Sequence, residues 1–322
     1  MKKTVKISFI VLMVLLSQLF ILPYAFSVTE FENKEDYKPF AESKFTTING
    51  VRIHFREWNS GKDSVKGNIL LIHGFSGSTF SWRRNIDTLV KEGYHVVAAD
   101  VPPFGYSTKQ KKINHSTSAN AMVLWKLSDS LNSGKWIIAG HSMGASIAGA
   151  MAAMHPDKTN KLILVDGTFE GTEMSDKIGF KNWLISSNPV KGLAEIIGKS
   201  YFHNYKKFKK LLASAYSQEP DSMSVLGYMQ PFQQKRITSA ILESVRSHEI
   251  QTLLLSGIKA PVLVIWGSKD TWIPIEAGNN FMEKYPAATF KVINGAGHCS
   301  METHPGVFNK LFSEFISNDS VH

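Results

Sequence analysis

"IIAGHSMGASIAGAM", residues 137–151, places Ser142 between Gly140 and Gly144, directly after an apolar run and before a stretch of small residues. A nucleophile on a sharp strand-to-helix turn has strained backbone angles, and its neighbours two positions away pass too close to carry side chains. The helix that follows would point its N-terminal amides at a developing negative charge. The stretch therefore indicates a nucleophile elbow, although an ordinary glycine-rich turn can give the same letters.

The rest of the chain alternates short apolar runs with helical segments. The runs cover 68–74, 94–100, 135–140, 161–167, 261–267 and 289–295, and the helical segments cover 79–92, 117–133 and 143–155. Unbroken apolar runs suit strands covered on both faces, and strand-helix alternation predicts a doubly wound, mostly parallel α/β sheet. Alternating residues on both sides of Asn49-Gly50 add an N-terminal antiparallel hairpin.

One long interval interrupts this alternation. About 90 residues separate the fourth run from the fifth, and they are rich in Met, Phe, Tyr and Leu. This is far longer than a crossover connection. The sequence predicts an inserted helical cap at about 170–255 within a single domain spanning 28–322.

The first 27 residues have a different composition. Three lysines precede an apolar run from Ile7 to Leu22, and Ala25-Phe26-Ser27 follows. This layout predicts a secretory signal peptide cleaved after Ser27, with an uncleaved membrane anchor through residues 7–22 as the alternative. Either way the body is expected to be exported, as a secreted protein or on the outer face of the cell membrane. A single cysteine, Cys299, excludes an internal disulfide.

Polar side chains follow several of the apolar runs, where an open α/β sheet binds its ligands. Asp270 comes after the run at 261–267 and His298 after the run at 289–295. Asp270 could orient the ring of His298, which would accept the proton of Ser142. Each residue alone has an ordinary interpretation as a turn or loop residue. Serine, acid and histidine in this order, each just after a strand, point to a triad.

The run at 68–74 ends in His73-Gly74-Phe75, where a turn can expose a backbone amide. The N–H groups of Phe75 and Met143 are predicted to form an oxyanion hole for a tetrahedral intermediate. His73 itself is interpreted as a residue that hydrogen-bonds loop backbone, rather than as a proton-transfer group.

With these residues in place, the chain resembles the α/β-hydrolase superfamily, of the serine esterase and lipase type. The matching motifs are "HGFSGS", "DVPPFGYS" at 100–107, "GHSMG", "GSKDTWIP" and "GAGH". The resemblance implies Ser142 as nucleophile, Asp270 as acid, His298 as base, and Phe75 and Met143 as oxyanion donors. One departure is Pro103, where members of the family often have glycine.

The resemblance implies hydrolysis of a small or medium acyl ester through an acyl-enzyme intermediate. A lipase or monoacylglycerol-type hydrolase, a carbon–carbon bond hydrolase and a cofactor-free perhydrolase use similar triads and remain alternatives. A serine nucleophile disfavours haloalkane dehalogenases and epoxide hydrolases, which use aspartate. An alternative of another class is a binding protein that keeps the fold without the chemistry.

Several residues invite other interpretations. Asp166, after the run at 161–167, is a rival acid, and Cys299 beside His298 is interpreted as a packed thiol. The lysines at 206, 207, 209 and 210 are expected to lie on a solvated cap helix, not on a nucleic-acid surface. The histidines do not occur at the spacings of metal ligands, and no glycine-rich loop has a phosphate-binding pattern. No metal or other cofactor is therefore expected. The expected partner is a small acyl substrate.

Overall fold

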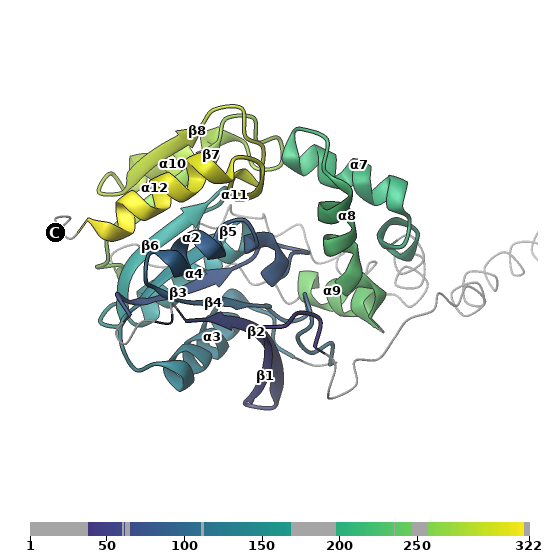
Figure 1. Ribbon diagram of the computed structural model, residues 1–322, viewed down its shortest axis with the longest axis horizontal. Coiled ribbons are helices and arrows are strands. Elements are labelled where there is room, and N and C mark those ends of the chain that lie inside the picture. Colours follow the sequence, from purple (N-terminus) through teal and green to yellow (C-terminus); the bar gives the residue numbers. More distant parts are fainter. Residues whose placement is uncertain are drawn as a thin grey trace, which may run out of the picture.

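The computed structural model describes residues 38–59, 61, 65–110, 113–168, 198–234, 236–246 and 257–318. Its centre is a sheet of eight strands in the order β1-β2-β4-β3-β5-β6-β7-β8 (Figure 1). β2 runs antiparallel to β1 and β4, and every other pair of neighbours is parallel. The strands are β1 Ser43–Ile48, β2 Val51–Trp58, β3 Asn68–Ile72, β4 His95–Ala99, β5 Trp136–His141, β6 Thr159–Val165, β7 Val262–Gly267 and β8 Thr289–Ile293.

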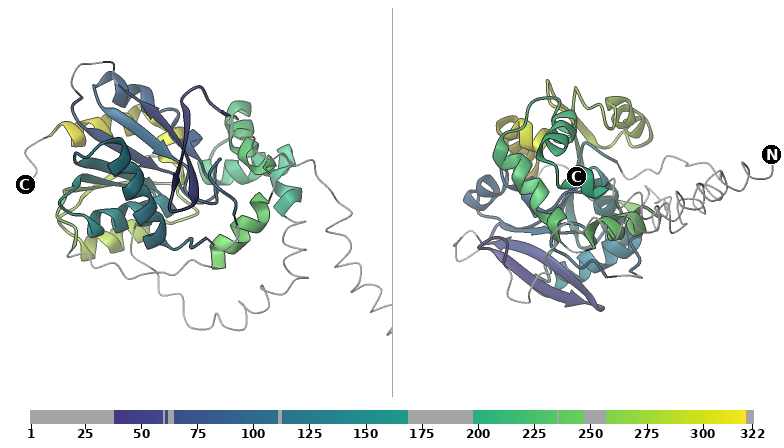
Figure 2. Two further views of the ribbon diagram at one scale, coloured as in Figure 1. Left: turned by 90° about the horizontal axis from the view of Figure 1, so that it is seen from below. Right: turned by 90° about the vertical axis from the view of Figure 1, so that its right-hand side faces the viewer.

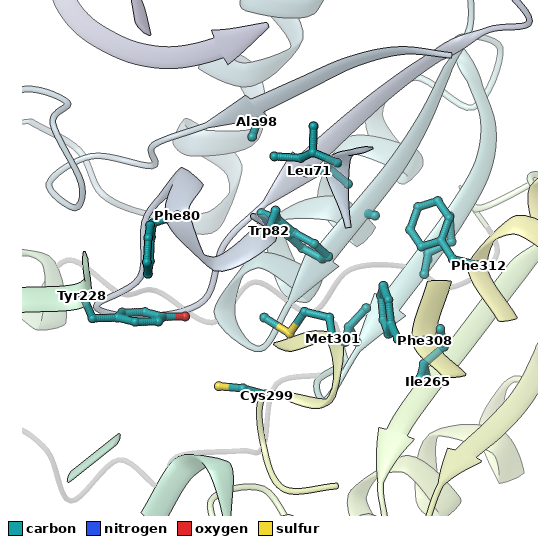
Figure 3. Close-up of a cluster of buried hydrophobic side chains, with 14 of the residues drawn as sticks. Leu71, Phe80, Trp82, Ala98, Tyr228, Ile265, Cys299, Met301, Phe308 and Phe312 are labelled. Carbon is teal, nitrogen blue, oxygen red and sulfur yellow. The ribbon is translucent and has the colours of Figure 1, made fainter. Parts of the chain in front are cut away.

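Helices cover both faces of this sheet. α2 (Ile86–Lys91) and α12 (Pro305–Ser317) pack with the cluster that contains Leu71, while α3 (Thr117–Leu131), α4 (Met143–Met154) and α10 (Ile275–Lys284) pack with the cluster that contains Leu70. Side chains of adjacent residues in one strand thus point into opposite layers, as the pleat of a strand requires. Figure 3 shows part of the first layer, where Trp82, Met301 and Phe308 meet beside the sheet. The predicted doubly wound α/β architecture is confirmed.

The predicted N-terminal hairpin is also present. β1 and β2 pair from Ser43 opposite Arg56 to Ile48 opposite Val51. Asn49 and Gly50 between them have φ values of 52° and 79°. Both residues at positive φ are what a two-residue turn of the primed type needs, and this geometry matches the twist of the two strands.

Two details differ from the sequence-based expectation. The helix predicted over 79–92 is divided into η1 (Thr79–Trp82) and α2, because the Asn85 side chain between them bonds Met301 O at 3.0 Å and Asn309 Oδ1 at 2.8 Å. The run at 289–295 was expected to be covered on both faces, and this was wrong. β8 is the last strand of the sheet, and Val292 on it is 45% exposed.

The described part of the interval predicted as a cap contains further helical segments, among them α7 (Tyr205–Tyr216), α8 (Ser222–Met229), η2 (Gln230–Gln233) and α9 (Ile237–Arg246). Figures 1 and 2 show α7, α8 and α9 grouped together beside the sheet, apart from α10 and α12. Residues 169–197, 235 and 247–256 of this interval lie outside the described residues, so its extent at 170–255 stays a prediction.

The predicted leader at residues 1–27 also lies outside the described residues. Within the ranges given above, none of the helices combines the length and the apolar character that crossing a bilayer requires.

Candidate active site

Ser142 lies at the turn between β5 and α4. Its backbone angles are φ 52° and ψ −119°, which a residue with a side chain rarely adopts. The Ser142 N–H donates to Val165 O on the neighbouring strand at 2.9 Å, and its own carbonyl accepts from Ala145 N at 2.8 Å. These bonds hold the strained turn from both sides, so the serine side chain projects from a fixed backbone.

Glycines surround this turn because the backbone segments pass very close together. A Cβ on Gly140 would lie 2.0 Å from Gly144 O, and a Cβ on Gly144 would lie 2.5 Å from Ile72 O. Two more glycines share this role but escaped the sequence analysis. A Cβ on Gly74 would lie 3.0 Å from Ser142 Cβ, and one on Gly167 would lie 2.7 Å from Ser142 Cα. Side chains at these positions would displace the serine.

The structure brings Ser142, His298 and Asp270 into one hydrogen-bonded chain. His298 Nε2 lies 2.9 Å from Ser142 Oγ, and His298 Nδ1 lies 2.7 Å from Asp270 Oδ2. The other oxygen of the carboxylate, Asp270 Oδ1, accepts from Trp272 N at 2.8 Å and Ile273 N at 2.9 Å. The Asp270 side chain is fully buried. With Oδ1 occupied by two amides, Oδ2 is the oxygen that orients the ring of His298.

A second histidine, His141, holds the loop that carries His298. His141 Nε2 lies 2.7 Å from His298 O, and the two rings are tilted with their centroids 5.0 Å apart. Burial, together with the charge of His298, lowers the pKa of His141 to about 3. His141 is therefore neutral and donates its Nε2–H to the carbonyl. The sequence places it within the elbow motif but gives no sign of a contact 157 residues away.

The peptide group between Gly74 and Phe75 has a fixed orientation beside Ser142. Its carbonyl oxygen, Gly74 O, accepts from His73 Nδ1 at 2.7 Å and from Gly77 N at 3.0 Å. His73 Nε2 accepts from Val101 N at 2.9 Å, so the ring must carry its proton on Nδ1. Because C=O and N–H point in opposite directions in a trans peptide, the Phe75 N–H points away from His73.

The His73 side chain therefore hydrogen-bonds backbone groups on both sides of its ring. It stays neutral because burial lowers its pKa. We expect His73→Ala to reduce kcat for hydrolysis about tenfold or more, because the candidate oxyanion donor at Phe75 would lose the bond that orients its peptide. The unpaired Val101 N–H should also cost about 1–3 kcal/mol of stability. Steady-state kinetics normalised to folded protein checks this. His155→Ala, on an exposed histidine beyond α4, is the control, and equal kcat in both variants would contradict the assignment.

The hydrogen bonds of Asp166, the rival acid, go to Gly267 and Ser300 and not to His298. Asp166 Oδ1 accepts from Gly267 N at 2.7 Å, and Oδ2 accepts from Ser300 N at 3.0 Å and Ser300 Oγ at 2.6 Å. Gly267 precedes Asp270 and Ser300 follows His298 by a few residues. Asp166 thus ties the end of β6 to both loops, and Asp270 is the acid that faces the histidine.

Burial of the Asp166 carboxyl raises its pKa from 3.8 to about 7, although its hydrogen bonds oppose the shift. The folded protein then keeps this proton at a pH where the unfolded chain has lost it. Its contribution to the free energy of unfolding is complete below about pH 4 and declines as the pH rises to about 7, by up to about 4 kcal/mol.

Asp166→Asn should remove this decline. We expect a pH-independent loss of stability from the mispaired Ser300 amide, and a flatter dependence of unfolding free energy on pH between 4 and 7. Urea unfolding of both proteins across this range measures the difference. Parallel curves for the two proteins would show that Asp166 does not titrate in this interval.

Two side interpretations can be followed in the structure. Cys299 is buried in the apolar layer drawn in Figure 3, and burial raises the pKa of its thiol well above the usual range, as fits a packed thiol. On α7, Lys206, Lys207 and Lys210 are exposed, and Lys209 Nζ pairs with Glu219 Oε2 at 2.8 Å. The lysines of this helix face solvent.

Known proteins share this architecture. Residues 67–305 match the family model of the α/β hydrolase fold. The chain is 26% identical over 284 residues to an uncharacterized hydrolase of Bacillus subtilis, covering 84% of this chain and 96% of that protein. It is 25% identical over 287 residues to a 2-hydroxy-6-oxononadienedioate/2-hydroxy-6-oxononatrienedioate hydrolase of Burkholderia vietnamiensis, with coverage of 86% and 96%.

A solved structure of a probable hydrolytic enzyme from Pseudomonas aeruginosa has the same fold. Its TM-score is 0.69 at 20% sequence identity, with coverage of 87% of this chain and 95% of that one. The family model spans most of this chain, from the start of β3 to the start of α12. The chain therefore belongs to the α/β-hydrolase fold family.

Proposed function

We propose that this α/β-hydrolase cleaves small or medium acyl esters through an acyl-enzyme intermediate on Ser142. The observation that carries the proposal is the continuous chain from Ser142 Oγ through His298 to the buried Asp270 carboxylate. Ser142 attacks the ester carbonyl while His298 Nε2 takes its proton, and the proton then passes to the departing alkoxide. Water repeats the sequence to release the acid.

The charge that forms on the carbonyl oxygen also needs a partner. The N–H of Phe75, in the peptide held by His73, and the N–H of Met143, at the start of α4, are the proposed donors. The N-terminus of α4 adds its positive end at the same place. These groups complete what ester hydrolysis requires, since the leaving alkoxide needs only a proton from His298.

The side chains next to the triad favour an apolar substrate. Phe75 and Trp272 are both 45% exposed. The Phe75 ring packs on Phe104 at 5.0 Å, and the Trp272 ring stacks on His298 at 5.4 Å between centroids. Two partly exposed aromatic rings beside the reacting atoms suit the acyl or alkyl part of an ester better than a charged group.

A second candidate is hydrolysis of a carbon–carbon bond. It is favoured by the similarity to the Burkholderia vietnamiensis protein, a 2-hydroxy-6-oxononadienedioate/2-hydroxy-6-oxononatrienedioate hydrolase. Here the leaving group is a carbon, so a proton must reach carbon before the bond breaks. Ester hydrolysis does not need this extra proton transfer, which is why the ester reaction is our first proposal.

A substrate panel tests the proposal. Purified protein is assayed with p-nitrophenyl acetate, butyrate, octanoate and palmitate, and with a 2-hydroxy-6-oxo-dienoate, using Ser142→Ala as the blank. We expect kcat/KM to be highest for a short or medium acyl chain. Cleavage of the dienoate without ester turnover above the blank would replace the ester proposal with the carbon–carbon one. A jump in rate on emulsified long-chain ester would indicate a lipase.

A further inference from the structure

The last turn of α7 lies against both loops that carry the candidate triad. The helix ends at Tyr216, and Ser217 follows with φ 53° and ψ 26°, a left-handed conformation that closes the helix. Residues 214–217 are consecutive, and each makes a hydrogen bond to a residue within four positions of Asp270 or His298. Such a concentration of bonds at one helix end calls for an explanation beyond the packing of the cap.

Two of these bonds reach the loop of Asp270. Ser217 Oγ donates to Lys269 O at 2.8 Å, directly before the acid. Trp272 Nε1 donates to Ser214 Oγ at 3.2 Å, and the ring of this tryptophan stacks on His298. The helix end therefore holds the acid loop on both sides of Asp270.

A third bond reaches the backbone of the base itself. The N–H of His298 donates to Ala215 O at 2.7 Å. The preceding residue, Gly297, is packed so closely that a Cβ would lie 2.6 Å from Ala215 O and 2.7 Å from Ser217 Oγ. The carbonyl of His298 is held by His141, so α7 and the elbow fix the two ends of this residue.

The fourth bond leads into a buried ionic cluster. Tyr216 OH donates to Glu302 Oε2 at 2.7 Å, and Arg83 and Tyr228 also donate to this carboxylate. The Glu302 side chain is fully buried, and Arg83 supplies the opposite charge. Figure 3 shows the ring of Tyr228 beside that of Phe80. A carboxylate with this many donors has a fixed place, four residues after His298.

From these contacts we infer that the C-terminal turn of α7 is a positioning element for the candidate triad. It sets the distance between the acid loop and the base loop, with Tyr216 and Ser217 as its positioning residues. This inference rests on the proposed function. It means that this end of the cap does not lift away from the site between turnovers, because the His298 amide and the Glu302 carboxylate would lose buried partners.

The inference is tested with Tyr216→Phe, Ser217→Ala and the double variant. Each removes one hydroxyl and leaves the remaining atoms in place. We expect each single change to lower kcat about threefold to tenfold with little change in KM, and the double variant to lose more. The acidic limb of the pH profile of kcat/KM should move to lower pH, because a loosened Asp270–His298 bond stabilises the imidazolium less. The rate of labelling of Ser142 by a fluorophosphonate should fall in parallel.

Tyr205→Phe is the matched control, because it removes the same hydroxyl from the first turn of the same helix, where this group bonds the exposed Ser222 Oγ at 3.2 Å. We expect it to leave all three readouts unchanged. All rates are normalised by titration of active sites, so a loss of folded protein does not count. If Ser142 of the parent protein labels and the variants label at the parent rate, the inference is wrong. If the parent protein does not label at all, the proposed function fails instead.

Discussion

We expect Ser142→Ala to lower kcat for p-nitrophenyl butyrate by a factor of about 10⁴–10⁶ while the protein stays folded. The substitution deletes the Oγ atom that is proposed to form the acyl-enzyme bond, so the candidate oxyanion donors at Phe75 and Met143 could assist only slow attack by water. Alanine fits the strained turn, because the close approaches there involve backbone and Cβ atoms, which alanine and serine share. Steady-state kinetics, with circular dichroism to verify folding, measures the effect.

Ser146→Ala provides the control, because Ser146 lies one turn along α4 and its hydroxyl bonds Thr168 O at 2.8 Å, away from His298. We expect this variant to keep the parent kcat to within a few-fold, as a lost hydrogen bond at a partly buried site predicts. Turnover by Ser142→Ala at a tenth of the parent rate or more would mean that another group attacks the ester.

The second large effect is expected for Asp270→Asn, which should lower kcat by about 10⁴. Oδ1 at this position accepts two backbone N–H groups, so an asparagine must turn its amide NH₂ toward His298 Nδ1. The ring must then accept at Nδ1 and carry its proton on Nε2, facing Ser142. In that tautomer it cannot take the proton of the serine.

Asp166→Asn separates the two candidate acids in the same assay. Asp166 faces backbone of both loops, so its replacement should leave most of the turnover intact. The reverse outcome, with activity lost in Asp166→Asn and kept in Asp270→Asn, would reassign the acid to the end of β6. Both variants change one carboxyl group to an amide, so the comparison depends on what each carboxyl group bonds.

The sequence predicted the parts of the fold that local patterns encode. Strands such as β3 and β7 are continuous apolar runs buried on both faces, and the turn at Asn49-Gly50 follows from the φ values these residues tolerate. The placement of Ser142, Asp270 and His298 after the carboxyl ends of β5, β7 and β8 was predicted from their positions just after apolar runs. The single helix expected over 79–92 was wrong, because side-chain bonds of Asn85 to Met301 in α11 (Ser300–Thr303) and to Asn309 in α12 override the local preference.

Contacts between distant residues escaped the sequence analysis. Arg83 and Glu302 are 219 residues apart and meet in an ion pair whose carboxylate is fully buried, and Tyr216 and Tyr228 join them from two further helices. No periodicity links these positions, since their partners depend on how the helices of residues 205–229 dock.

Covalent labelling with a fluorophosphonate tests the central claim most directly. The parent protein is incubated with the probe, digested, and examined by mass spectrometry to locate the adduct. We predict one adduct, on Ser142. It should form faster in the parent protein than in Asp270→Asn, and it should be absent from Ser142→Ala. The account would be contradicted if the folded parent protein carried no adduct. It would also be contradicted by an adduct on another serine, such as Ser43, whose Oγ lies 2.8 Å from His54 Nε2.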